Sequence, residues 1–125
     1  MGTEHEKLIG EFCAAWERRD PDELAGYFTD DAVYHNIPMA PITGRDAIRQ
    51  TIEMIGGGAQ GAEFEMLHIA SAGNVVHTER VDRFVIGGKQ VAIPVAGVFE
   101  VTGGKISAWR DYFDLATWTR QTEAG

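Results

Sequence analysis

The stretch VVHTERVDRF, residues 75–84, decides the fold of this chain. Successive side chains of an extended strand point to opposite faces, and here one face carries three polar groups between two apolar ones. The residues of that face are Val76, Thr78, Arg80, Asp82 and Phe84. This mixture is unusual for a solvent-exposed face and unusual for a plain core. The stretch therefore predicts a strand with a polar site on its inner side.

The period of two continues on both sides of this stretch, from residue 63 to the end of the aromatic-rich segment near residue 114. We predict strands over Phe64–Ala70, Val75–Ile86, Gln90–Val101 and Ile106–Asp114, with an earlier strand over Ala32–Ile37. Short glycine-containing turns separate the last four strands, at residues 72–74, 87–88 and 103–104. Connections this short favour hairpins, so the pattern predicts an antiparallel meander.

The first half of the chain has helical periods instead. Apolar residues recur every 3.6 positions across residues 4–19, which predicts an amphipathic helix. A second helix is expected to begin with Asp20 as its N-cap and Pro21 in its first turn, with Glu23 completing a capping box, and to end near Phe28.

A third helix is predicted after another capping-box match, Thr43 with Asp46, and Gly56-Gly57-Gly58 is expected to end it. A short helix over about 115–122 closes the chain. Helices that precede a run of strands indicate an α+β domain, with the helices packed on one face of a curved sheet.

Length and charge narrow the class of protein. A chain of 125 residues forms one domain, residues 1–125. Its net charge of −8 repels phosphate backbones, so we expect no nucleic-acid partner. Cys13 is the single cysteine, which excludes an intrachain disulfide and a thiolate metal site. The N-terminal residues carry neither a secretory signal nor a long apolar run, and we expect a cytoplasmic protein with no membrane partner.

One motif match fails on its context. The segment GGGAQG, residues 56–61, fits a dinucleotide fingerprint, but that fingerprint needs a strand before it and a helix after it. Here a helix precedes and a strand follows, so we interpret the segment as a flexible loop and expect no cofactor. The four histidines, at positions 5, 35, 68 and 77, show no metal-ligand spacing, and we expect no metal.

A set of polar residues on three predicted strands remains. Alternation places Arg80 beside Asp82, and it places Asp111 on one face of the last strand together with Trp109 and Phe113. Burying a carboxylate costs several kcal/mol unless it is paired. Two aspartates around one arginine can divide their roles, one ionised and one protonated, and so supply a base and an acid.

The first strand adds a phenol and an amide, Tyr34 and Asn36, that are able to hold a water molecule. The pattern also fits a simpler interpretation. In that interpretation the arginine and an aspartate form a structural ion pair on the sheet, and the aromatic residues of the last strand belong to the core.

Read together, several segments resemble the limonene-1,2-epoxide hydrolase family within the nuclear-transport-factor-2-like (NTF2-like, SnoaL-like) superfamily. They are YHNIPM at 34–39, GRDA at 44–47, TERVD at 78–82, GVF at 97–99, GKI at 104–106 and WRDYFD at 109–114. The resemblance implies a cone-shaped α+β fold. In such a fold a strongly curved mixed sheet carries helices on its concave face around a deep apolar pocket.

The resemblance also implies a function. It makes Asp111 the base that deprotonates water, Asp82 the acid that protonates the epoxide oxygen, and Arg80 the link between them, while Tyr34 and Asn36 help to hold the water. The residues expected to line the substrate pocket are Trp109, Phe113 and Phe84. The expected reaction adds water, without a cofactor, to a small apolar cyclic epoxide and gives a vicinal diol. Family members pair through the outer sheet face, which implies a homodimer.

Two other functions remain open for this fold. A ketosteroid-isomerase-like or polyketide-cyclase-like enzyme would use one carboxylate to abstract a carbon-bound proton. A non-catalytic binding or dimerisation module would keep the arginine and aspartates only as an ion network.

Overall fold

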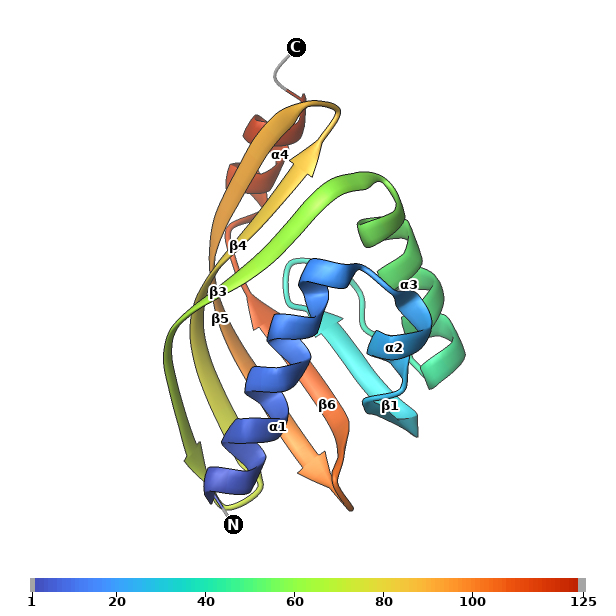
Figure 1. Cartoon of the computed structure of the whole chain (residues 1–125), viewed down its shortest axis with the longest axis vertical. Helices are drawn as coiled ribbons and strands as arrows, with labels where there is room; N and C mark the ends of the chain where they lie inside the picture. The colour runs from blue at the N-terminus through green and yellow to red at the C-terminus, as the bar shows by residue number, and fades with distance from the viewer. Residues whose placement is uncertain (1, 124–125) are drawn as a thin grey trace.

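The computed structural model describes residues 2–123 as a six-stranded sheet with helices against it (Figure 1). The elements are α1 (Gly2–Ala15), the 3-10 helix η1 (Trp16–Arg18), α2 (Pro21–Ala25), β1 (Phe28–Asn36), β2 (Ile42–Thr43), α3 (Arg45–Gly57), β3 (Ala59–Ala72), β4 (Val75–Ile86), β5 (Lys89–Thr102), β6 (Lys105–Tyr112) and α4 (Leu115–Glu123). The predicted α+β class is confirmed. None of the helices within residues 2–123 has the length and apolar character needed to cross a bilayer.

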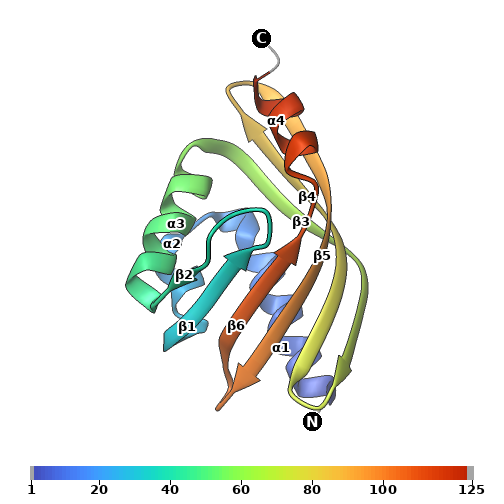
Figure 2. The same cartoon turned by 180° about the vertical axis from the view of Figure 1, so that it is seen from behind.

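The sheet is mixed, and its strands follow the order β2-β1-β6-β5-β4-β3. Strands β3 to β6 form the antiparallel meander that the glycine turns predict. Strand β1 joins the other side of β6 in parallel, and short β2 pairs with β1. The long strands β3, β4 and β5 curve together, and α1, α2 and α3 lie on the concave face (Figures 1 and 2). The open side of this curve is where a pocket can form.

The N-terminal helices are shorter than the sequence period suggests. The regular helix ends at Ala15, a 3-10 turn follows, and Arg19 adopts a left-handed conformation with φ of 51°. The Asp20 side chain then caps α2 by accepting hydrogen bonds from the backbone amides of Asp22 and Glu23, as predicted. Helix α2 stops at Ala25 rather than near residue 28, because the chain there already enters β1.

Two predicted boundaries around α3 are wrong. Thr43 is not the N-cap, because it is paired with Val33 in the sheet, and Gly44 makes the turn into the helix with φ of 96°. Only glycine adopts that conformation without strain. The glycine segment after α3 is not a flexible loop either. Its first two glycines end the helix and Gly61 already belongs to β3, although the order of helix then strand is as expected.

The last helix protects a sheet edge. The N-terminal half of β5 has no partner on the β6 side, since β6 pairs only with β5 residues from Ala96 onward. Helix α4 lies along this stretch, and the Gln121 side chain bonds both the amide and the carbonyl of Ala92, at 2.7 and 2.8 Å. The helix therefore covers an edge that is otherwise open, and it brings Trp118 over Phe84 with 5.8 Å between ring centroids.

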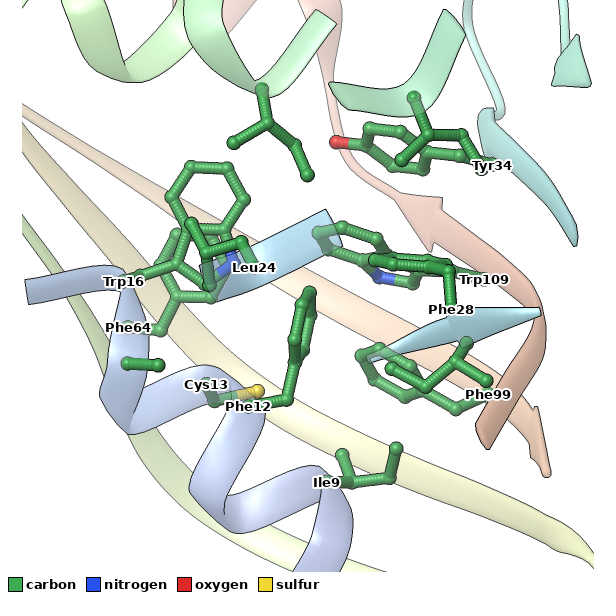
Figure 3. Close-up of a cluster of buried hydrophobic side chains, with 14 of the residues drawn as sticks. Ile9, Phe12, Cys13, Trp16, Leu24, Phe28, Tyr34, Phe64, Phe99 and Trp109 are labelled. Carbon is green, nitrogen blue, oxygen red and sulfur yellow. The ribbon is translucent and has the colours of Figure 1, made fainter. Parts of the chain in front are cut away.

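The core between α1 and the sheet is built from aromatic rings (Figure 3). Phe12 on α1 contacts five other rings edge-on, among them Phe28, Phe99 and Trp109. Trp109 is fully buried and stacks between Tyr34, at 4.1 Å, and Phe99, at 5.4 Å. The polar residues at the neighbouring strand positions therefore pack against these rings.

Candidate active site

The register of the sheet places the polar residues in one row. Asn36 on β1 lies beside Asp111 on β6, Asp111 beside Gly97 on β5, and Gly97 beside Thr78 on β4. A register shift in β6, between its pairings at residues 106 and 108, turns both Ile106 and Trp109 inward and keeps Asp111 on the same inner face. The row therefore joins four strands that are far apart in the sequence.

Arg80 occupies the centre of this inner face and is fully buried. Its Nε and Nη2 donate to the two oxygens of Asp82, at 3.0 and 2.7 Å. Its Nη2 and Nη1 donate to the two oxygens of Asp111, at 2.8 and 3.2 Å, and Nη1 also donates to Thr78 Oγ1 at 3.1 Å. These bonds use all five N–H donors of a guanidinium group. Arg80 is therefore held in one orientation as a bridge between two carboxylates.

Gly97 makes this bridge sterically feasible. A Cβ atom at this position would lie 2.4 Å from Arg80 Nη1, 2.7 Å from Asp111 Oδ1 and 2.8 Å from Thr78 Oγ1. All three separations are shorter than van der Waals contact allows. Because Gly97 has no side chain, space remains between Thr78 and Asp111 in the row. The Arg80 guanidinium occupies this space and contacts Asp111.

The two carboxylates differ in their surroundings. Asp111 accepts a third hydrogen bond, from Trp109 Nε1 at 2.6 Å, whereas the partners of Asp82 within residues 2–123 are the two nitrogens of Arg80. Burial, and the nearby charge of Asp111, raise the pKa of Asp82 to about 6, although Arg80 opposes the rise. Burial acts against the charge of Arg80, but Asp111 and Asp82 outweigh it and keep the pKa of the guanidinium well above its usual range. Asp82 therefore keeps its proton up to a higher pH than a free aspartate does.

Tyr34 and Asn36 stand next to Asp111. Tyr34 is 4% exposed and its ring stacks on Trp109, while Asn36 is the sheet neighbour of Asp111. Burial raises the pKa of the Tyr34 phenol, as does the charge of Asp111, and a hydrogen bond with the Asn36 side chain opposes the rise. The phenol therefore stays protonated and remains a hydrogen-bond donor throughout the neutral range.

A cavity of about 140 Å³ opens over these groups. Asp82 and Asp111 reach its wall together with Tyr34 and Asn36, so the structure brings four of the five predicted polar residues to one surface, with Arg80 directly behind them. The remaining wall is apolar or aromatic apart from one indole N–H group on each of two tryptophans. It is formed by Trp16, Met39, Ile55, Phe64, Phe84, Ile93, Val95, Phe113, Leu115 and Trp118.

Two of the three residues that were expected to line the pocket do so in the structure. Phe84 and Phe113 line the cavity, but Trp109 does not, because its ring is covered on one face by Tyr34 and on the other by Phe99. The prediction that Trp109 contacts the pocket is therefore wrong, and its polar atom serves Asp111 instead. Sequence reasoning missed Trp16 and Trp118. Trp16 was visible only as part of an apolar helix face, and helical period does not separate a pocket residue from a core residue.

Phe64 has a second function besides lining the cavity. Its ring lies under the Arg80 guanidinium, with 4.9 Å from Cζ to the ring centroid, and it stacks on Trp16 at 4.7 Å. A cation over an aromatic face is attracted by the ring quadrupole. Within residues 2–123, no group of three or more histidine, cysteine, aspartate or glutamate side chains is arranged to hold a metal ion.

Comparison with known proteins is consistent with this geometry. Residues 3–123 match the family described as limonene-1,2-epoxide hydrolase catalytic domain. Epoxide hydrolase EphG of Mycobacterium tuberculosis is 36% identical over 104 residues, which are 83% of this chain and 69% of that protein.

Solved structures share the fold. A limonene-epoxide-hydrolase-like epoxide hydrolase of M. tuberculosis superimposes with a TM-score of 0.85 at 33% identity, covering 98% of this chain and 95% of that one. A SnoaL-like protein of Shewanella denitrificans gives a TM-score of 0.86 at 16% identity, over 97% and 98% of the two chains, and shows the fold alone. The fold is thus of the NTF2-like, SnoaL-like type. With the family match over nearly its whole length, the chain belongs to the limonene-1,2-epoxide hydrolase family and is an epoxide hydrolase.

Proposed function

We propose that this enzyme adds water to a small apolar, cyclic epoxide in a single step and releases a vicinal diol, without a cofactor. The observation that carries the proposal is the sharing of one buried guanidinium by two carboxylates, both of which reach an apolar cavity. Two carboxylates and one guanidinium hold a net negative charge when both acids are ionised. One proton on the pair neutralises the cluster, which leaves one base and one acid.

In the proposed step Asp111 is the base and Asp82 the acid. A water molecule held by Tyr34, Asn36 and Asp111 attacks an epoxide carbon, and its proton passes to Asp111. The carbon–oxygen bond of the ring breaks as Asp82 gives its proton to the departing oxygen. A proton then returns from Asp111 to Asp82 and resets the site. Each transfer contributes roughly 10²- to 10⁴-fold to the rate.

The surroundings of the two acids support this division of roles. Burial raises the pKa of Asp82, which suits a group that must be protonated before the reaction. Asp111 accepts hydrogen bonds from Trp109 and from two nitrogens of Arg80, which hold its carboxylate in one orientation at the cavity wall. They also reduce the nucleophilicity of Asp111, so water rather than the carboxylate is the attacking group.

The cavity wall supports the proposed substrate class. Phe84 and Phe113 contribute rings from β4 and from the segment before α4, and Ile93 and Val95 contribute aliphatic surface from β5. An apolar ring gains free energy from burial against such a wall, at about 25 cal/mol per Å² of apolar surface removed from water.

A homodimer is part of the proposal, together with a cytoplasmic location. The outer sheet face supports the dimer, because it carries neighbouring apolar and aromatic side chains. Val81 on β4 neighbours Pro94 on β5, and Ala96 on β5 neighbours Tyr112 on β6. Tyr112 is 46% exposed in the single chain. Light scattering of the purified protein distinguishes a dimer from a monomer, and a monomeric mass at all concentrations would remove the dimer from the proposal.

A panel of racemic cyclic epoxides tests the reaction. We expect diol formation by the wild type, and loss of more than 90% of the rate in Asp82→Asn and in Asp111→Asn, since an amide cannot take part in these proton transfers. Asp31→Asn is the matched control, because Asp31 is exposed on β1. The absence of diol from every epoxide would refute the proposal. Isomerisation of a ketone substrate by the same protein, without diol formation, would indicate that a carboxylate abstracts a carbon-bound proton.

Isotope labelling tests the direct attack of water. With enzyme in excess over epoxide in ¹⁸O water, a single turnover should give diol that already carries the label. Unlabelled diol in the first turnover, with ¹⁸O appearing later in Asp111 or Asp82, would show an ester intermediate and refute the single step.

A further inference from the structure

Trp16 lines the cavity and carries a hydrogen-bond donor that no catalytic step uses. Its side chain is 1% exposed, and it lines the cavity from η1, at the end of the helical layer. Nε1 of this residue is one of two buried side-chain polar atoms that find no hydrogen-bond partner within residues 2–123. The other is Nε of Arg45, a residue whose guanidinium pairs with Asp30 on the surface.

The contrast with Trp109 shows that this unpaired donor is unusual for the protein. The Trp109 indole is equally buried, and its N–H donates to Asp111 at 2.6 Å. Buried polar groups are nearly always paired, because an unpaired one loses its hydrogen bond to water without compensation. An exception in a pocket wall is therefore best explained by an acceptor that the ligand brings.

The edge of the Trp16 ring that carries the donor is turned towards the stack of Tyr34 and Trp109, of which Tyr34 lines the cavity. Trp16 itself stacks on Phe64, which also lines the cavity. In Figure 3 the Trp16 nitrogen lies on the side of its ring that is turned towards the stack of Tyr34 and Trp109. The Trp109 ring, 6.2 Å away and inclined by 64°, offers this N–H at most a weak contact with its π face.

We propose that the substrate carries, besides the epoxide oxygen, a second oxygen atom that accepts a hydrogen bond from Trp16 Nε1. This inference rests on the proposed function and deepens it. It assigns Trp16 a role in specificity, and it narrows the substrate class to apolar epoxides with one further hydroxyl, ether or carbonyl oxygen.

The charges around the cavity indicate that this second oxygen is uncharged. The lining residues include no lysine, arginine or histidine, and they include two aspartates. The guanidinium of Arg80 is already fully engaged by those aspartates and by Thr78. A carboxylate or phosphate on the substrate would meet only like charge, whereas a neutral oxygen is compatible with an indole donor in an apolar wall.

A pair of nearly isosteric substrates tests the inference. Ethyl-substituted and methoxy-substituted cyclohexene oxides, each with the group at ring position 3 or 4, differ only by a methylene replaced by an oxygen. We expect wild-type kcat/KM to favour a methoxy substrate over its ethyl partner, and Trp16→Phe to lower that ratio about fivefold to tenfold, the worth of one hydrogen bond. An unchanged ratio in Trp16→Phe at both ring positions would overturn the inference.

Trp118→Phe is the matched control variant. Trp118 is another cavity-lining tryptophan, but its N–H is not among the unpaired buried groups. This substitution should change kcat/KM for the ethyl and methoxy substrates by the same factor. A drop in the methoxy-to-ethyl ratio equal to that of Trp16→Phe would show that the preference does not depend on the Trp16 donor.

Nuclear magnetic resonance separates the inference from the hydrolase proposal. The three tryptophans of the chain give three indole N–H signals, and the Trp16 signal is the one absent in Trp16→Phe. The methoxy diol should move the Trp16 indole proton downfield in the wild type, while the ethyl diol should not. Equal shifts with both diols, or none, would overturn the inference even if epoxides are hydrolysed. A selective shift without any epoxide turnover would instead refute the proposed function alone.

Discussion

Replacing Gly97 by alanine tests whether the gap in the polar row holds the catalytic bridge together. The backbone of Gly97 does not have a left-handed φ, so alanine fits the local conformation. The new methyl group, however, falls 2.4 Å from Arg80 Nη1 and 2.7 Å from Asp111 Oδ1. Both atoms are buried and hydrogen-bonded, so neither side chain can simply move aside. The methyl group therefore has to displace the guanidinium.

The expected cost follows from what the displacement breaks. Overpacking a buried site costs about 1–3 kcal/mol, and each hydrogen bond to a charged group is worth about 1.5–3 kcal/mol. Two bonds depend directly on Nη1, those to Thr78 and to Asp111. With partial relaxation we expect a loss of roughly 2–4 kcal/mol in the free energy of unfolding, which for a domain of this size lowers Tm by roughly 6–20 °C.

Activity should fall more steeply than stability. A shift of about 1 Å in a catalytic group can cost about 100-fold in rate, and the methyl group displaces the residue that positions both Asp82 and Asp111. We expect kcat on the preferred epoxide to fall at least about 100-fold in the fraction that remains folded. Thermal unfolding and steady-state kinetics on the same preparation measure both effects.

Gly10→Ala is the matched control. A Cβ atom at Gly10, on α1, meets no atom within 4 Å, and alanine is favoured over glycine in a helix by about 1 kcal/mol. Its Tm should stay equal or rise, with kcat unchanged. The reasoning fails if Gly97→Ala keeps both its Tm and its kcat. A lower Tm with wild-type kcat would show that the sheet accommodates the methyl group without moving Arg80.

Three further predictions concern groups in the site and one buried group near it. Because burial raises the pKa of Asp82 to about 6 and the acid must be protonated, kcat/KM should fall above that pH. The stability that the protonated carboxyl contributes should also be lost as pH rises from 3.8 through 6, which pH-dependent denaturation measures; a flat profile in both would contradict the assignment. Tyr34→Phe and Asn36→Ala should lower kcat more than they raise KM, since a water-holding group acts in the transition state; a change in KM alone would make them substrate contacts. Burial raises the pKa of Cys13 to about 12, so a thiol reagent should modify it only after unfolding, and fast reaction of the native protein would disprove its burial.

Local sequence was sufficient for most of the strands. Alternation in β4 and β5 and the glycine turns between strands are set by neighbouring residues, and the meander appears as predicted. The inner face of β4 was also predictable, because a period of two depends only on the extended backbone. It placed Thr78, Arg80 and Asp82 side by side before any tertiary contact was known.

Element ends were less predictable, because tertiary contacts override local signals there. Thr43 carries a capping-box pattern, yet pairing with Val33 keeps it in the sheet, and Gly44 begins the helix turn. Strand β6 ends at Tyr112, so Phe113 reaches the cavity from outside the strand. In both places a sheet partner, absent from the local sequence, decides where the element stops.

The sequence by itself determined which chemical groups share a strand face, whereas only the tertiary structure decided which faces meet. Asp111 lies 31 positions from Arg80, and the two touch because β5 brings Gly97, with no side chain, between them. The same packing hides Trp109 between two rings and turns Trp16 to the cavity wall, although both belong to apolar stripes. Side-chain periodicity is a property of a few consecutive residues, but contact between strands depends on register, bulges and the room that one missing side chain leaves.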